Sequence, residues 1–235
     1  MQLDSHGISD IGLARRRNED SFLVDRNRAA FAVADGLGGL PNGALASSTA
    51  ITMLADALAG GVRPKDLERL FKDINLEVYN LGQHLNPDTG IGTTLTVGVV
   101  DRDALEIFHV GDTAIYRFQR ETWGQLTVDH TMEQEIRSRP DYNPQIPIPR
   151  RHSHVLTRCL GQIEDLPVDT VSVPLVSGDR ILFCSDGVTL AITPDEIHQR
   201  IFQATSPDRA VRDLIDLANE RGGLDNATAI ALFVS

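Results

Sequence analysis

Hydrophobic residues along this chain form two kinds of pattern, short apolar or alternating runs and longer stretches with helical spacing. The short runs predict strands at residues 21–25, 29–34, 94–100, 105–110, 115–118, 168–173, 180–185 and 228–234. The three runs between residues 94 and 118 follow one another through tight turns, so we expect them to be antiparallel neighbours. Two of the apolar runs stop at an Asp-Gly pair, as a buried strand that ends at a turn would.

Helical spacing of apolar residues occurs in two pairs of segments. The first pair covers residues 46–58 and 67–81, and the second pair begins at Thr193 and at Ser206. Thr193 and Glu196 have the spacing of a capping box, with a proline at the first helical position. Because helix pairs alternate with runs of strands, rather than one helix with one strand, the order predicts an α+β fold with antiparallel sheets.

The segment from about residue 131 to 161 follows neither pattern. It has little hydrophobic periodicity and carries four prolines, Pro140, Pro144, Pro147 and Pro149. We therefore predict an irregular surface excursion that acts as a mobile flap. The length of 235 residues fits one domain, so we expect residues 1–235 to form a single domain that includes this flap.

Composition places the chain among ordinary globular proteins, with 41% hydrophobic and 23% charged residues. No apolar run reaches the roughly 18 residues that a membrane-spanning helix needs, and the N-terminal residues lack the order of a signal peptide. We therefore expect a cytoplasmic protein without membrane contact. Cys159 and Cys184 are too few and too far apart for a disulfide framework or a zinc cluster, so we expect plain core thiols.

Acidic residues outnumber basic ones, 33 Asp and Glu against 22 Lys and Arg, for a formal net charge of −11. This charge would repel the phosphate backbone of nucleic acids, so a nucleic-acid partner is not expected. Part of the excess could be a cluster of carboxylates that binds divalent cations, whose charge the formal count leaves out.

Asp35, Asp186 and Asp225 share one local setting, a turn beside an apolar strand with Gly or Asn as the next residue. Any one of them alone is explained as an ordinary turn. Taken together they favour a functional site, because a turn needs neither the Gly-Leu-Gly-Gly run after Asp35 nor a Ser-Asp-Gly at the end of a run as apolar as residues 181–184. Carboxylates that converge at about 4 Å repel by about 4 kcal/mol per pair at an effective dielectric near 20, so they must protonate or bind cations.

The ligand type indicates which cation such a cluster would take. Carboxylate and carbonyl oxygens favour Mg²⁺ or Mn²⁺, and no His or Cys stands at ligand spacing with the acids to favour zinc. The arginine run at residues 15–17 could supply a fork that binds two phosphate oxygens. A solvated basic run explains the same residues, and the pattern alone does not single out one arginine.

Six short motifs in one order resemble the bacterial branch of the type 2C, metal-dependent serine/threonine protein phosphatases. They are Arg15-x-x-Asn18-Glu19-Asp20, Asp35-Gly36-Leu37-Gly38-Gly39, Gly92-Thr93-Thr94, Gly111-Asp112-Thr113, Ser185-Asp186-Gly187 and Asp225-Asn226. The resemblance extends from about residue 10 to residue 234. It implies a four-layer αββα sandwich, two antiparallel β-sheets flanked by helix pairs, and it equates residues 131–161 with the variable flap of that family.

The resemblance also implies roles for the metal ligands. Asp35 would bridge two Mn²⁺ or Mg²⁺ ions, the carbonyl oxygen of Gly36 would bind one of them, and Asp186 and Asp225 would complete the direct protein ligands. Asp112 with Asp186 would hold a weaker third ion.

The implied reaction is direct attack on phosphothreonine or phosphoserine by a water that bridges two metals, without a phosphoenzyme. Arg15 would hold the phosphoryl oxygens, and Asp20 would orient water and Arg15, with Glu19 as a lesser candidate for a similar supporting role. Leu37 stands where animal members often carry a His proposed as general acid, so the resemblance leaves the proton donor open. Ala114 and Thr113 replace the Arg and Ser of the common motif.

Four histidines match none of the motifs and receive no role, because a lone His is more often structural: His109, His130, His152 and His154. An inactive pseudophosphatase that binds partners is the main alternative, although such a protein would be expected to lose its central acids. A metal phosphodiesterase would need base-recognition features that the sequence lacks. We expect a monomer whose partners are phosphorylated proteins, including a serine/threonine kinase or its substrates.

Overall fold

The computed structural model describes residues 1–163 and 165–235. The strands are β1 (Leu3–Asp10), β2 (Asp20–Asp25), β3 (Ala30–Asp35), β4 (Leu95–Asp101), β5 (Ala104–Val110), β6 (Ala114–Phe118), β7 (Trp123–Gln125), β8 (Asp169–Pro174), β9 (Arg180–Cys184) and β10 (Ala227–Val234). The helices are α1 (Gly43–Ala59), α2 (Leu67–Leu85), α3 (Met132–Arg137), α4 (Asp186–Thr189), α5 (Pro194–Gln203) and α6 (Pro207–Glu220), with the 3-10 turns η1 (Pro64–Asp66) and η2 (Arg150–His154).

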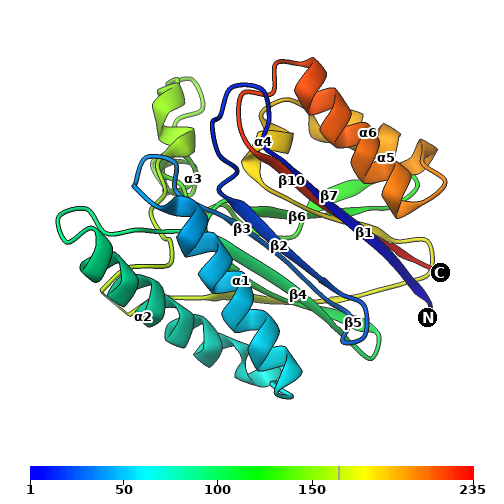
Figure 1. The fold of residues 1–235 in the computed structure, drawn as a ribbon. Coiled ribbons are helices and arrows are strands. Elements are labelled where there is room, and N and C mark those ends of the chain that lie inside the picture. Colours follow the sequence, from blue (N-terminus) through cyan, green and yellow to red (C-terminus); the bar gives the residue numbers. More distant parts are fainter. Residues whose placement is uncertain (164) are drawn as a thin grey trace.

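Within these residues the strands form two five-stranded sheets, in the orders β1-β10-β9-β6-β7 and β2-β3-β4-β5-β8. The pairs within both sheets are antiparallel. Helices α1 and α2 cover the outer face of the second sheet, while α5 and α6 cover the outer face of the first (Figure 1). This arrangement confirms the predicted α+β fold and the αββα order of layers.

Alternation along the strands fills three apolar layers, one under each helix pair and one between the sheets. In the middle layer Phe31 of β3 meets Phe183 of β9, with ring centroids 5.9 Å apart. Gly98 of β4 lies against the same ring, and a Cβ built on it would stand 2.6 Å from Cζ of Phe183. The two sheets therefore approach closely because this strand position has no side chain.

The structure contains elements that the apolar pattern did not predict. Strand β1 was missed because its sequence, LDSHGISD, has few apolar residues, yet every residue of it pairs with β10. Its outer end brings the backbone of Gln2 onto Ser235, with N–H···O distances of 2.8 and 3.0 Å. The short β7 and the four-residue α4 were missed as well, because elements of this length leave no periodic signal.

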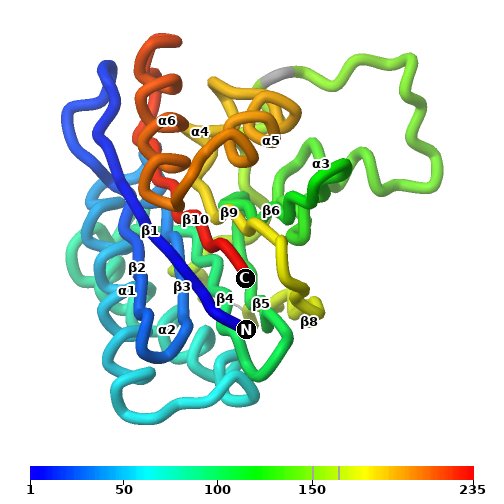
Figure 2. The backbone as a smooth tube through the Cα atoms, turned by 90° about the vertical axis from the view of Figure 1, so that its right-hand side faces the viewer, coloured from blue at the N-terminus to red at the C-terminus, as the bar shows by residue number. Residues whose placement is uncertain are grey.

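The predicted flap is partly regular. It contains α3 and η2, and the capping residue of α3 is Thr131, whose hydroxyl accepts from the N–H of Gln134. The segment that follows α3 runs in a wide loop away from both sheets (Figure 2). At the other predicted helix start, the capping box of Thr193 and Glu196 is confirmed. In the part of the chain that the structure covers, no helix is both long and apolar enough to cross a bilayer.

The close approach at Gly98 predicts a specific stability effect. Gly98→Ala should lower the free energy of unfolding by about 1 to 3 kcal/mol, because the buried ring of Phe183 must move to admit the methyl group. Urea denaturation would measure the change. Gly124→Ala is the matched control, since a Cβ at that strand position meets nothing within 4 Å. Equal stability of the two variants would contradict the packing described here.

Candidate active site

The strand-end acids singled out in the sequence line one pocket at the edge of the two sheets. Asp35 is the last residue of β3, Asp186 begins α4 directly after β9, and Asp225 precedes β10. The pocket has a volume of about 590 Å³ and its wall includes Arg15, Glu19, Asp35, Gly36, Leu37, Thr94, Asp112, His154, Cys159, Asp186 and Asp225. Acids from both sheets therefore face one space.

Asp20 lies directly beneath this pocket. It is the cross-strand neighbour of Asp35 and is 8% exposed. One of its carboxylate oxygens, Oδ2, accepts from the hydroxyls of Ser185 (2.7 Å) and Thr228 (2.6 Å). Its other oxygen, Oδ1, is buried with no hydrogen-bond partner among the described residues. An unpaired buried oxygen of this kind is costly unless a water or a cation meets it.

The Gly92-Thr93-Thr94 motif holds the backbone of Asp35. The N–H of Asp35 donates to the hydroxyl of Thr94 (2.9 Å), and the carbonyl oxygen of Asp35 accepts from the hydroxyl of Thr93 (2.9 Å). That carbonyl also accepts from the N–H of Thr94 (2.8 Å). Side chains that fix both backbone groups leave the Asp35 carboxylate free to face the pocket.

The glycines after the acids are required by close approach. A Cβ on Gly36 would lie 2.4 Å from the backbone of Gly43, and one on Gly187 would lie 1.9 Å from the carbonyl oxygen of Asn226. Neither glycine has a positive φ. Gly187 thus allows the segment that carries Asp186 to pack directly against the segment that carries Asp225.

Asn226 joins this pair of segments to the N-terminal arm. Its amide oxygen accepts from the N–H of Glu19 (2.9 Å), and its amide nitrogen donates to the carbonyls of Ile11 (2.9 Å) and Arg17 (3.0 Å). In this position the arm presents Arg15 to the pocket, where Nη2 lies 2.7 Å from Oδ2 of Asp225. The structure therefore distinguishes Arg15 from its two neighbours in the basic run.

Burial and mutual repulsion raise the pKa values of the pocket acids. Desolvation is the main cause for Asp35, whose pKa is raised well above its usual value, and the charges of the neighbouring aspartates add to it. Burial, followed by the charge of Asp186, raises the pKa of Asp112 to about 7. Burial, followed by the charge of Asp225, raises the pKa of Asp186 to about 6. Such a group of acids is a strong attractor of cations.

The donor set fits hard divalent ions. It offers carboxylate oxygens and the carbonyl oxygen of Gly36, and the orphaned Oδ1 of Asp20 lies below. Among the residues that the structure describes, no three His, Cys, Asp or Glu side chains are placed so that they could hold a metal ion without moving. An ion bound by Asp225 would compete with the ion pair between Asp225 and Arg15. The two hydroxyls that donate to Asp20 would still hold its carboxylate in place.

Two flap residues reach the pocket without having been predicted there. Nδ1 of His154, in η2, lies 3.9 Å from Oδ2 of Asp186. Cys159 is half-buried in the pocket wall, whereas Cys184 lies in the core as expected. Burial raises the pKa of Cys159 to about 11, so its thiol is protonated at neutral pH and is a poor nucleophile. Short-range sequence patterns gave no signal for either residue. Their place in the pocket wall depends on how the segment 131–161 packs against distant parts of the chain.

Comparison with known proteins gives consistent results. A family model described as protein phosphatase 2C matches residues 14–219. The serine/threonine phosphatase stp of Listeria monocytogenes is 29% identical over 232 residues, which cover 94% of this chain and 92% of that protein. Protein phosphatase PhpP of Streptococcus pneumoniae is 32% identical over 232 residues, 94% of this chain and 93% of its own. The catalytic domain of serine/threonine protein phosphatase PstP, solved with two manganese ions, has a TM-score of 0.85 at 29% identity and covers 99% of each chain.

The raised pKa values predict how stability depends on pH when ions are removed. In chelator, the folded protein binds more protons than the unfolded chain between pH about 4 and about 7, because unfolded aspartates titrate near 3.9 while Asp186 and Asp112 titrate near 6 and 7. The melting temperature should therefore fall as pH rises through this window. Mn²⁺ should flatten the curve, and Asp112→Asn should reduce its slope. Scanning calorimetry at several pH values tests this, and a melting temperature that rises with pH would contradict it.

Proposed function

The chain belongs to the protein phosphatase 2C family and is a metal-dependent serine/threonine protein phosphatase, and we propose that it hydrolyses phosphothreonine and phosphoserine at the pocket between its sheets. The observation that carries the proposal is the convergence of aspartates from both sheets with one arginine on a single pocket. Opposite charges side by side in one pocket can bind cations and a phosphoryl group together.

Two Mn²⁺ or Mg²⁺ ions would be held by Asp35, the carbonyl oxygen of Gly36, Asp186 and Asp225. Asp112, together with Asp186, would hold a third and weaker ion. Ions in these positions would lower the pKa of water and neutralise charge on the phosphoryl oxygens. The raised pKa values of Asp35, Asp112 and Asp186 support this assignment, because a bound cation offsets the repulsion that raises them.

Arg15 would bind the phosphoryl group. Its side chain is 41% exposed and reaches the pocket from the N-terminal arm, so a planar fork is available to two phosphate oxygens. In the structure this fork pairs with Asp225, and a substrate phosphoryl group would share or replace that contact. Asp20, fixed by two hydroxyls, would orient water from below.

The thiol and the hydroxyl among the described residues of the pocket wall are poorly placed to attack, which supports direct hydrolysis without a phosphoenzyme. Among the described residues that line the pocket, Cys159 is the one thiol, and burial raises its pKa to about 11. Thr94 uses its hydroxyl to accept from the N–H of Asp35, so it is committed to the frame. We therefore assign the attack on phosphorus to water.

The substrates would be phosphorylated cytoplasmic proteins, with a serine/threonine kinase or its targets among them, and one domain, residues 1–235, would perform the reaction. The alternative of an inactive, partner-binding pseudophosphatase requires loss of central groups. Here every acid and the arginine of the proposed set face the pocket or lie under it, which favours catalysis.

Activity measurements separate the two possibilities. Wild-type protein should hydrolyse a phosphothreonine peptide with Mn²⁺ or Mg²⁺ and not with chelator. Asp35→Asn should lower kcat by about 10³-fold, since several kcal/mol of charge stabilisation would be lost. A wild-type protein that is inactive under every metal condition, or an Asp35→Asn variant as active as wild type, would sink the proposed mechanism.

Arg15 has its own test. Arg15→Ala should lower kcat/KM for the phosphopeptide by about 30- to 100-fold, as expected for the loss of a charge-assisted hydrogen-bond pair worth about 2 to 3 kcal/mol. Arg15→Lys should recover only part of this loss, because Lys keeps the charge and not the fork. Arg16→Ala is the control from the same basic run. Similar kinetics for the Arg15 and Arg16 variants would refute the assignment of Arg15.

A further inference from the structure

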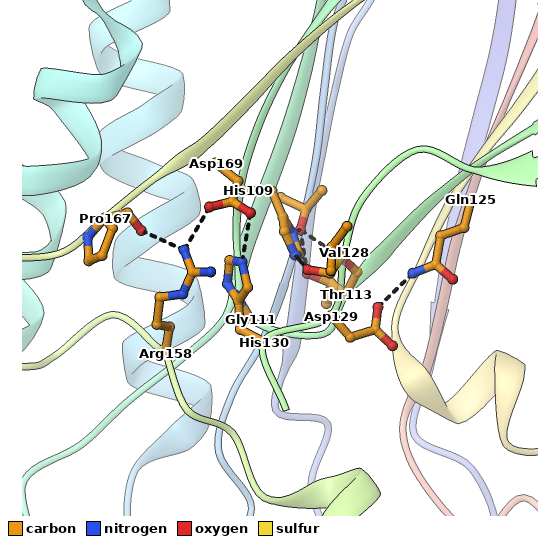
Figure 3. A network of polar contacts seen from close by, with 11 residues as sticks. His109, Gly111, Thr113, Gln125, Val128, Asp129, His130, Arg158, Pro167 and Asp169 are labelled. Carbon is orange, nitrogen blue, oxygen red and sulfur yellow. Dashed lines mark hydrogen bonds and ion pairs between the residues drawn. The ribbon is translucent and has the colours of Figure 1, made fainter. Parts of the chain in front are cut away.

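His130 makes two hydrogen bonds to the residue that precedes Asp112. The N–H of Gly111 donates to Nδ1 of His130 (3.0 Å), and the N–H of His130 donates to the carbonyl oxygen of Gly111 (2.8 Å). His130 is 2% exposed, and Figure 3 shows its ring beside Gly111. Both backbone polar groups of Gly111 are thus bound by one buried residue.

The far side of the His130 ring is tied to the flap. Nε2 of His130 lies 3.1 Å from Oδ2 of Asp169, the first residue of β8. The other carboxylate oxygen of Asp169 accepts from Nη1 of Arg158 (2.7 Å), which also donates to the carbonyl of Pro167 (Figure 3). Arg158 belongs to the flap, so a chain of polar contacts runs from the flap through Asp169 and His130 to Gly111.

These partners fix the tautomer of His130. A backbone N–H can only donate, so Nδ1 must accept from Gly111, and the proton of the neutral ring therefore lies on Nε2 and points at Asp169. Burial lowers the pKa of His130, which favours this neutral form. Although burial opposes it, the hydrogen bonds from Arg158 and His130 lower the pKa of Asp169, which keeps the acceptor ionised.

The residue that follows Asp112 is held as firmly. The hydroxyl of Thr96 bridges Thr113 and Nδ1 of His109 (2.7 Å), and Nε2 of His109 donates to the carbonyl of Val128 (3.0 Å). The rings of His109 and His130 lie 4.6 Å apart. Gly111 itself has φ +114°, and a Cβ there would lie 2.5 Å from the side chain of Thr94. Buried polar contacts therefore hold the turn that carries Asp112 on both sides.

We propose that His130 is a positioning residue, which holds the Gly111–Asp112 turn so that Asp112 faces the pocket, and which links this turn to the flap through Asp169 and Arg158. The inference rests on the proposed role of Asp112 as ligand of a weaker ion. A residue that orients a metal ligand contributes to metal affinity without touching the ion. Loss of such a residue typically lowers metal affinity or activity by about 10- to 100-fold.

Two substitutions separate the two bonds of the ring. The side-chain oxygen of Asn can take the place of Nδ1, so His130→Asn keeps the acceptor for Gly111 and loses the donor to Asp169. The longer Gln reaches the place of Nε2, so His130→Gln keeps the donor to Asp169 and loses the acceptor for Gly111. His84→Gln, on an exposed part of α2, is the matched control.

Mn²⁺ binding followed by calorimetry and by electron paramagnetic resonance is the decisive readout. His130→Gln should weaken the weaker site by about tenfold, with His130→Asn within about threefold of wild type and His84→Gln unchanged. In phosphopeptide hydrolysis, excess Mn²⁺ should restore kcat of His130→Gln, which a general loss of structure would not allow. Equal Mn²⁺ affinity in wild type and His130→Gln, or equal loss in the Asn and Gln variants, would overturn the proposal.

Asp112→Asn and the double variant Asp112→Asn/His130→Gln keep this test apart from that of the proposed function. If Asp112→Asn abolishes the weaker site, the added His130→Gln should change nothing further. If Asp112→Asn leaves all Mn²⁺ binding intact, the ligand assignment fails and the positioning role fails with it.

Nuclear magnetic resonance gives an independent readout: the Gly111 amide signal should move in His130→Gln and stay near its wild-type position in His130→Asn. An unmoved Gly111 signal in both variants would refute the hydrogen bond on which the proposal depends.

Discussion

The aspartates that share one pocket repel one another, and the surrounding structure must hold them together against this repulsion. Burial and neighbouring charges raise the pKa values of Asp35, Asp112 and Asp186, so these groups resist being held together. Free loops would relieve the repulsion by moving apart. Here Asp35 ends a strand, Asp186 begins a helix and Asp112 lies in the tight turn between β5 and β6, so the frame of the packed sandwich keeps them close and the charge is left for cations to offset.

Much of that frame consists of bonds to the backbone on either side of each acid. Thr93 and Thr94 bind the peptide groups of Asp35, and Asn226 ties the Asp225 loop to the N-terminal arm. Gly187 lets the Asp186 and Asp225 segments touch. Most residues of the short motifs therefore hold the backbone beside an acid in place, and one or two residues of each motif face the pocket.

Local patterns predicted the α+β fold, the helix pairs and the convergence of the strand-end acids, because each depends on periodicity or on turns within a few residues. They missed β1, whose few apolar residues pair along their whole length with a strand more than two hundred residues away. They also missed His130 and His154, whose settings depend on how distant segments pack. A buried histidine between a backbone N–H and a carboxylate has no sequence signature.

The pairing of β1 with β10 also bears on how the protein is made. β10 lies between β1 and β9 in its sheet, and Asp225 precedes it by two residues. During synthesis on the ribosome β1 must therefore wait until β10 emerges, although β2 to β5 and the helices α1 and α2 can already associate. Asp225 joins Asp20 and Asp35 only when this segment emerges, so a nascent chain that ends before residue 225 lacks part of the proposed centre.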